Sequence, residues 1–259
     1  MNAQVWMVIV IPFLGTCLGA AMVFFLKDRL SKSTERMLSG FAAGVMVAAS
    51  IWSLLLPAMD GAADMGRLSF IPAAVGFLIG IGFLLLLDNV TPHIHKTDQH
   101  EGPRSRLKRT TKLILAVTLH NIPEGMAVGV VCAGWSAGQT GVSLAAAFAL
   151  ALGIALQNFP EGAIVSMPLR AAGMQKGRTF LYGVLSGIVE PIGALFTIIA
   201  VSTVLSALPY MLAFAAGAMM YVVIDDLVPQ ISDGEHSNMG TVTFAFGFVL
   251  MMVLDVSLG

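Results

Sequence analysis

The chain has 259 residues, of which 57% are hydrophobic and 11% are charged, and its mean hydropathy is +0.85. Soluble globular proteins carry roughly 25% charged residues, so this composition excludes that class and predicts an all-α polytopic membrane protein. The net charge of −1 gives no basis for nucleic-acid binding. The two cysteines, Cys17 and Cys132, lie in apolar segments and are interpreted as packing residues rather than a disulfide framework.

The first predicted element is a transmembrane helix that is retained rather than cleaved. The run from Val5 to Leu26 is long enough to span a membrane, and Met1–Gln4 has no positive side chain typical of a secretory signal. Windows of about 20 apolar residues give eight predicted helices along the chain. They cover residues 4–26, 38–59, 69–90, 112–133, 142–167, 179–201, 207–228 and 240–258. The short connections between the last four favour a single transmembrane domain over residues 1–259.

Positive side chains distinguish the two sides of the membrane. Thirteen of the 14 Lys and Arg residues fall in the connections after the first, third and fifth predicted helices, and Arg67 alone falls on the other side. The positive-inside rule places these three connections in the cytoplasm and both termini outside, in a multi-pass protein of the cell membrane. Residues 91–111 are therefore predicted to form a cytoplasmic loop.

Two related polar segments interrupt the fourth and fifth predicted helices. They are Leu119-His120-Asn121-Ile122-Pro123-Glu124-Gly125 and Leu156-Gln157-Asn158-Phe159-Pro160-Glu161-Gly162. They share Leu, Asn, Pro, Glu and Gly in register, 37 residues apart. A carboxylate at bilayer depth needs a counter-charge or a metal ion, or it must be protonated. Two carboxylates accompanied by imidazole and amide groups therefore predict an intramembrane cation site.

Helical spacing places the polar side chains of each segment on one face. At about 100° per residue, Glu124 lies between His120 and Asn121, and the second segment repeats this arrangement around Glu161. The proline of each segment removes one amide donor, so a backbone carbonyl without its helical partner falls beside the proposed ligands.

Depth along the helices brings a third carboxylate to the same layer. At about 1.5 Å per residue, His120 lies about 12 Å and Glu124 about 18 Å from the inner edge of the membrane. By the same count Glu161 lies at about 13 Å, Gln157 at about 19 Å, and Glu190 of the sixth helix at about 18 Å. Three carboxylates at one level repel one another unless a dication joins them. This ligand set suits Zn²⁺ first, with Fe²⁺, Mn²⁺, Co²⁺ and Cd²⁺ as alternatives.

At these residues the chain resembles the ZIP (zinc/iron-regulated) metal transporters. The two segments are similar to the signatures of the family's fourth and fifth helices, and two other stretches resemble its prokaryotic GufA-like branch. Those stretches are Ser53-Leu54-Leu55-Leu56-Pro57-Ala58 and Leu185-Ser186-Gly187-Ile188-Val189-Glu190-Pro191. The resemblance covers essentially the whole chain. It implies eight helices with both termini outside, and an inverted repeat of helices 1–3 and 6–8 around helices 4 and 5.

The resemblance also implies a centre for two metal ions. Matched residue by residue, the first position consists of His120, Glu124, Gln157 and Glu161. The second consists of Asn121, Asn158, Glu161 and Glu190, with Glu124 as a bridging ligand. Family members are similar in moving Zn²⁺ and related ions into the cytoplasm, often as homodimers and by an elevator-like motion. This chain departs from them in two neutral groups, Gln157 where many members carry His and Asn158 where some carry Asp.

Acidic residues near both membrane surfaces are candidates for the ends of an ion path. On the outer side they are Asp60 and Asp64, for which ordinary solvated loop charges are an equal alternative. On the inner side they are Asp225 and Asp226 near the end of the seventh helix, followed by Glu235 and His236 in a connection without Lys or Arg. Asp88, at the inner end of the third helix, either contributes to the path or caps its helix.

The predicted cytoplasmic loop carries His93, His95 and His100. Alternating histidines in a flexible loop are able to capture metal, and relatives that the chain resembles often carry a His-rich loop at this place. A solvated loop without a metal role is the alternative interpretation.

Three functions are compatible with an intramembrane cation site. The predicted one is transport of a divalent metal, zinc first, with the metal as substrate, no catalytic cofactor and no enzyme activity. The alternative is an intramembrane metal-dependent hydrolase with Glu124 as base, but the His-Glu-x-x-His pattern of zinc proteases is absent. A metal-gated receptor or sensor is the third, and the small loops disfavour it. The predicted partners are metal ions, the lipid bilayer and a second copy of the chain.

Overall fold

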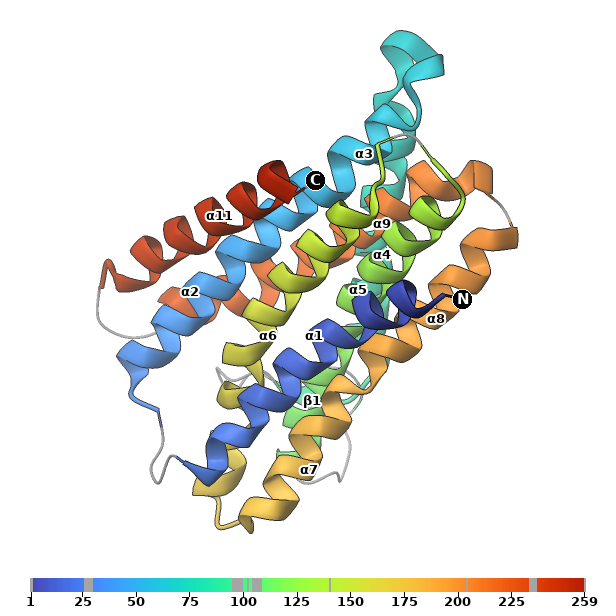
Figure 1. The fold of residues 1–259 in the computed structure, drawn as a ribbon. Helices are drawn as coiled ribbons and strands as arrows, with labels where there is room; N and C mark the ends of the chain where they lie inside the picture. The colour runs from blue at the N-terminus through green and yellow to red at the C-terminus, as the bar shows by residue number, and fades with distance from the viewer. Residues whose placement is uncertain are drawn as a thin grey trace.

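Helices long and apolar enough to cross a membrane make up most of the molecule (Figure 1). The computed structural model describes residues 2–25, 30–94, 100–101, 103, 109–139, 141–203, 205–232 and 237–258. Within this part of the chain there are eight such helical stretches, as the sequence predicts. They are Ala3–Phe24, Lys32–Asp60, Phe70–Val90, Ile114–Ser136, Leu144–Ala171, Lys176–Val201, Leu208–Ser232 and Met239–Leu258. The chain is a polytopic α-helical membrane protein.

The second and seventh spans each change from α-helix to π-helix before a proline. The first span consists of α1 (Ala3–Ala21) and η1 (Met22–Phe24). The second consists of α2 (Lys32–Ala49), η2 (Ser50–Leu55) and α3 (Leu56–Asp60). The third is α4 (Phe70–Val90), which follows η3 (Ala63–Leu68). The π-helical η2 precedes Pro57 of α3, and the π-helical η5 (Val223–Leu227) precedes Pro229 of α10 (Val228–Ser232). Proline has no amide to donate, and a π-helical turn is a common adjustment where the regular hydrogen-bond register is broken.

The fourth and fifth spans form the centre of the bundle. They are α5 (Arg109–Ser136) and α6 (Leu144–Ala171), and both remain helical through Pro123 and Pro160. In the most apolar part of each, 72% of the residues are buried, against 28% in α4 and 17% in α11 (Met239–Leu258). Polar groups on α5 and α6 are therefore shielded from lipid, which makes these helices the place where an intramembrane charge is least costly.

The sixth span is divided, although the sequence predicts one helix over residues 179–201. It consists of α7 (Lys176–Gly187) and α8 (Val189–Thr203), which meet at Ile188. Pro191 has no amide for the carbonyl of Gly187, so the regular hydrogen-bond ladder is broken there. Glu190 consequently lies in the first turn of α8, where the positive end of the helix dipole stabilises a carboxylate. The seventh span follows as η4 (Leu205–Ala207), α9 (Leu208–Val222), η5 and α10.

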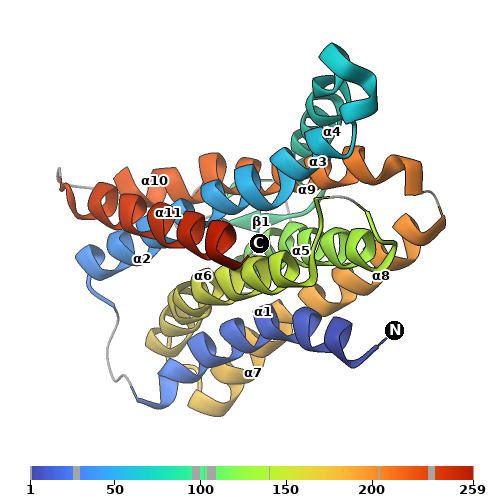
Figure 2. The ribbon, with the colours of Figure 1, turned by 45° about the horizontal axis from the view of Figure 1, so that its top comes forward.

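The helices pack in four main pairs: α1 with α6, α5 with α8, α2 with α11, and α4 with α9. Figure 2 shows α5 and α6 lying between α1, α7 and α8 on one side and α2, α9 and α11 on the other. In an inverted repeat, spans 1, 2 and 3 correspond to spans 6, 7 and 8, and span 4 corresponds to span 5. The α2–α11 pair (spans 2 and 8) then corresponds to the α9–α4 pair (spans 7 and 3). The α1–α6 pair (spans 1 and 5) corresponds to the α8–α5 pair (spans 6 and 4). This is the pairing that an inverted repeat requires, and the repeat itself stays a prediction.

Glycines allow the paired helices to approach closely. A Cβ atom at Gly19 of α1, Gly44 of α2, Gly80 of α4 or Gly129 of α5 would overlap with a backbone carbonyl of the partner helix. Such contacts replace the hydrophobic driving force that is missing between helices in lipid.

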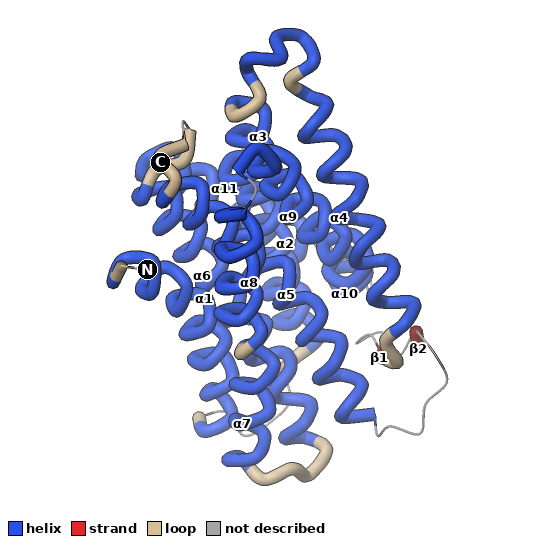
Figure 3. Tube along the Cα trace, turned by 90° about the vertical axis from the view of Figure 1, so that its right-hand side faces the viewer, coloured by secondary structure: helices blue, strands red, loops and turns tan. Residues whose placement is uncertain are grey.

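The connection between α4 and α5 contains a short antiparallel ladder within the described residues. Strand β1 (His93–Ile94) pairs with β2 (His100–Glu101), with His93 opposite Glu101 and Ile94 opposite His100. Figure 3 shows both strands toward one end of the bundle, while α3 and the start of α4 project at the other. His95 lies outside the described residues, as do Glu235 and His236 of the predicted inner mouth.

Candidate metal centre

Three buried carboxylates meet in the interior of the bundle. Glu124 of α5, Glu161 of α6 and Glu190 of α8 are 0%, 7% and 1% exposed. They are close enough to one another to interact electrostatically. The sequence places these residues at one depth, and the structure directs all three inward rather than toward lipid. Since like charges repel strongly where the dielectric constant is low, the arrangement favours a bound cation.

Glu124 is held by an amide from the neighbouring helix. Gln157 Nε2 donates a hydrogen bond of 2.6 Å to Glu124 Oε1. Glu124 Oε2 and Gln157 Oε1 are buried and have no hydrogen-bond partner within the described part of the chain. Two oxygens, one anionic and one neutral, are thus available to a hard or borderline cation.

Glu190 is held by two donors, one of which the sequence analysis missed. Thr16 Oγ1 on α1 donates to Glu190 Oε1 at 2.6 Å, and Asn158 Nδ2 on α6 donates to Glu190 Oε2 at 2.9 Å. Asn158 Oδ1 is buried and has no hydrogen-bond partner among the described residues. The sequence offers only a weak signal for Thr16, because it is a single polar residue between Gly15 and Gly19 in a largely apolar helix.

The two remaining predicted ligands are anchored to other elements. His120 Nδ1 lies 3.4 Å from Asp226 Oδ2 of η5, and both side chains are buried. Metal-binding histidines commonly have a carboxylate at the ring nitrogen that does not bind the metal, and Asp226 lies at such a position beside Nδ1 of His120. Asn121 Nδ2 donates a 3.0 Å hydrogen bond to the carbonyl oxygen of Ser186, next to the break between α7 and α8.

The centre is not a closed cage of anionic ligands. Within the described residues, no three His, Cys, Asp or Glu side chains are placed so that they could hold one metal ion together. Gln157 donates to Glu124 Oε1 and Asn158 donates to Glu190 Oε2. An ion that uses these two oxygens shares them with the amide donors, whereas Glu124 Oε2 has no hydrogen-bond partner among the described residues.

The predicted inner acidic residues lie closer to the centre than their sequence position suggests. The sequence predicts the seventh helix to end at residue 228, whereas α10 extends it to Ser232, so Asp225 and Asp226 lie farther from its end than predicted. Asp226 is buried beside His120, and Asp225 is half-buried. Asp88 is also buried, in the last turn of α4. The side chains of His93 and His100 are not described, so their predicted metal capture is untested.

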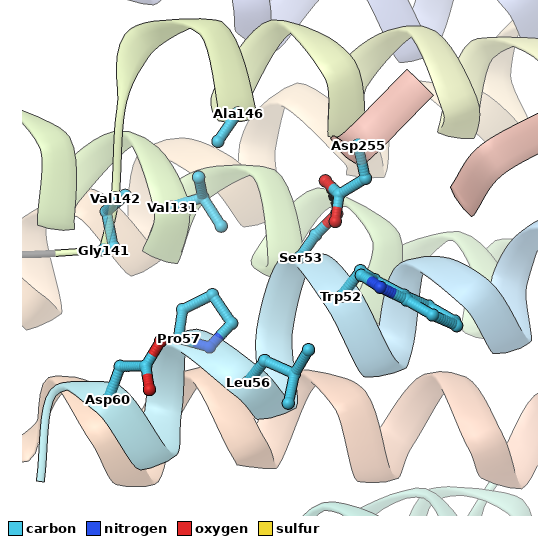
Figure 4. A pocket seen from close by; sticks show the side chains of 10 residues that line it. All are labelled: Trp52, Ser53, Leu56, Pro57, Asp60, Val131, Gly141, Val142, Ala146 and Asp255. Carbon is cyan, nitrogen blue, oxygen red and sulfur yellow. Dashed lines mark hydrogen bonds between the residues drawn. The ribbon is translucent and has the colours of Figure 1, made fainter. Parts of the chain in front are cut away.

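A pocket of about 220 Å³ lies between the second, fourth, fifth and eighth spans, and it is called the outer pocket because it lies at the predicted outer side (Figure 4). Its polar lining is Ser53, Asp60 and Asp255. Ser53 Oγ donates a 2.8 Å hydrogen bond to Asp255 Oδ1. Asp255, a buried acidic residue near the end of an apolar helix, was missed by the sequence analysis. Asp64 is exposed in η3 and does not line this pocket.

Comparison with known proteins gives the same family along the whole chain. The ZIP zinc transporter family model matches residues 104–255. The zinc transporter GufA of Myxococcus xanthus is 38% identical, over 95% of this chain and 96% of that protein. The zinc transporter ZIPB of Bordetella bronchiseptica is 40% identical, over 95% and 79% respectively. The zinc transporter ZIP11 of Xenopus tropicalis is 38% identical, over 94% of both. The chain therefore belongs to the ZIP family, whose members are transporters and not enzymes, and it has relatives in the GufA-like branch of that family.

Proposed function

We propose that the chain carries divalent metal ions, zinc first, across the cell membrane into the cytoplasm. The ligands of the proposed two-metal centre are His120, Asn121, Glu124, Gln157, Asn158, Glu161 and Glu190. The observation that carries this proposal is the meeting of three buried carboxylates from α5, α6 and α8 beside three amide groups. The names of the relatives, all zinc transporters, support zinc as the first candidate ion.

The chemistry of this ligand set suits passage better than permanent binding. Structural zinc sites are closed and rich in thiolate, and no cysteine belongs to the proposed centre. Glu124 and Glu190 each have an amide donor that competes with the metal for a carboxylate oxygen. When the ion leaves, these donors return to the carboxylates and limit the cost of buried unpaired charge. A ligand set with such built-in replacement donors is able to release its ion.

The outer pocket supplies an entrance on the same helix faces as the centre. Val131 lines the pocket and lies seven residues, about 10 Å, after Glu124 on α5. Between the two levels the interior is apolar, because Val128, Leu150 and Ile154 are almost completely buried there. Packed apolar side chains therefore separate an ion in the pocket from the centre, and its passage to the centre requires a conformational change.

The helix pairs indicate how that change is organised. The proposed ligands lie on α5, α6 and α8, and Thr16 adds α1, so the α1–α6 and α5–α8 pairs carry the centre. The α2–α11 and α4–α9 pairs form a second group. We propose that the first group moves against the second in an elevator-like motion. On the inner side, the contact between His120 and Asp226 links the centre to the proposed exit.

We infer the direction of transport from charge. The placement of Lys and Arg predicts that the α6–α7 connection is cytoplasmic and that the pocket is outside. An inside-negative potential favours entry of a dication by about 4.6 kcal/mol per 100 mV if both charges cross the full field. The position of both termini outside and the homodimer stay predictions.

Zinc flux into proteoliposomes tests the proposal. Vesicles that contain the purified protein and an internal zinc indicator are expected to fill faster than protein-free vesicles, and an inside-negative potassium diffusion potential is expected to accelerate filling. Cells that express the chain are expected to gain zinc. Absence of flux from monodisperse, correctly inserted protein, or a loss of cellular zinc, contradicts transport into the cytoplasm.

A further inference from the structure

We infer that Thr16 is a positioning residue for the metal centre: its hydroxyl orients the Glu190 carboxylate, and through it sets metal affinity. The inference rests on the proposed function, because it treats Glu190 as a ligand. Thr16 belongs to none of the polar segments that define the candidate centre, and it comes from α1, a helix that contributes no proposed ligand.

The contact itself is buried and specific. Thr16 is 2% exposed, and its Oγ1 lies 2.6 Å from Glu190 Oε1, although the two residues are 174 positions apart in the chain. In a membrane interior a hydroxyl commonly bonds to the carbonyl of its own helix, as Thr197 Oγ1 does with Gly193 O at 2.8 Å. Thr16 instead donates across the bundle to a carboxylate. A hydroxyl–carboxylate bond is charge-assisted and stronger than a bond between neutral groups.

The surrounding helices fit closely around Thr16. A Cβ atom at Gly187 would lie 2.8 Å from Thr16 Cγ2 and 3.2 Å from Glu190 Oε1, and a Cβ atom at Gly162 would overlap with the Thr16 carbonyl. Gly15 likewise brings α1 directly onto the backbone of α6. With its methyl group and backbone enclosed by glycines of α6 and α7, Thr16 has little freedom, so its hydroxyl is held at Glu190.

Together with Asn158, Thr16 fixes both oxygens of the Glu190 carboxylate. Oε1 accepts from Thr16 and Oε2 accepts from Asn158, and the carboxylate lies in the first turn of α8. A carboxylate oxygen accepts more than one interaction, so Oε1 keeps a lone pair for a cation while the hydroxyl holds its direction. Hydrogen bonds of this kind to metal ligands contribute about 10- to 100-fold in metal affinity or activity.

Metal binding to purified protein tests this role. Zinc is titrated by competition with a fluorescent chelator, and bound metal is counted after dialysis, for wild type, Thr16→Val, Thr16→Ser and Glu190→Gln. Thr16→Val keeps the shape and the methyl group but removes the hydroxyl, and it is expected to weaken zinc binding by about tenfold, no more than Glu190→Gln does. Thr16→Ser keeps the hydroxyl and is expected to bind close to the wild-type level. Thr197→Val is the matched control, because it removes a buried membrane hydroxyl outside the centre.

The outcomes separate this inference from the proposed function. Zinc affinity of Thr16→Val equal to wild type overturns the inference, as does a Glu190→Gln variant that binds as wild type. Wild-type protein that binds no zinc contradicts the proposed function instead. If Thr16→Val is not monodisperse, Thr16→Ala serves as the second variant, because it removes the hydroxyl without filling the space. A loss in both Val and Ala variants with recovery in Ser supports the inference; an equal loss in Ser overturns it.

Discussion

Glu124 and Glu190 reach the centre from α5 and α8, which pack directly against each other, and their surroundings differ. Glu124 accepts from Gln157 through one oxygen and keeps the other without a hydrogen-bond partner among the described residues. Glu190 has a donor on each oxygen and lies at a helix N-terminus. Because an unsatisfied buried carboxylate gains most from a cation, the Glu124 side is expected to hold its ion more tightly. For the proposed two-metal centre, the difference predicts two unequal positions, a main one at Glu124 and an auxiliary one at Glu190.

The largest effect is expected at Glu161, which is a full member of both proposed positions, whereas Glu124 belongs to the first and bridges to the second. Glu161→Ala is expected to abolish zinc flux with the protein still inserted, because neither position retains its full charge. Glu161→Gln, which keeps the volume of the side chain, is expected to be equally inactive. Tracer zinc flux in proteoliposomes provides the measurement, and robust flux from either variant counts heavily against a shared carboxylate.

The next effect compares the two sides directly. Glu124→Gln is expected to reduce zinc flux by about 100-fold and Glu190→Gln by about tenfold, because the latter carboxylate already has two protein donors. Equal losses at saturating zinc would show that the two positions act as one, and a reversed order would refute the assignment of the main position.

A smaller effect is expected at Asn158, which donates to Glu190 and belongs only to the proposed second position. Asn158→Ala removes the donor to Glu190 Oε2 and an amide oxygen, yet leaves Glu124 and Gln157 in place. We expect flux to persist with a changed order of preference among Zn²⁺, Cd²⁺ and Mn²⁺. The measurement is competition by each ion in the flux assay. Total inactivity, with normal insertion, is incompatible with an auxiliary role.

The smallest effect is expected outside the centre, in the outer pocket. Asp255→Asn keeps a group that can bond to Ser53 but removes the charge that attracts cations. Zinc uptake is expected to show KM raised by about two- to fivefold with an unchanged maximal rate, and the difference is expected to shrink at high salt. An unchanged KM at low ionic strength would exclude Asp255 from the entrance.

The sequence predicts the helices and the segments on α5 and α6 because both depend on local pattern. Apolar length identifies each span, and the repeated Asn-x-Pro-Glu-Gly pattern marks Glu124 and Glu161 without knowledge of packing. Glu190 is reached by counting depth along one helix. These features need no information about which helices are neighbours.

Thr16 and Asp255 were missed for the opposite reason. A single threonine in an apolar helix carries no pattern, and its contact with Glu190 depends on how α1 packs against α6 and α8. Asp255 meets Ser53 only because α11 pairs with α2. The break at Ile188 was also missed, since the loss of one amide at Pro191 does not by itself show whether a helix bends or restarts.

The most direct test of the central claim locates the ion itself. Anomalous scattering at the zinc absorption edge, from crystals of zinc-loaded protein, is expected to show its strongest peak between α5, α6 and α8. Carboxylate oxygens of Glu124 and Glu161 are expected at about 2.0–2.2 Å from it. A strongest peak elsewhere in the molecule, with no density between these carboxylates, would contradict the account.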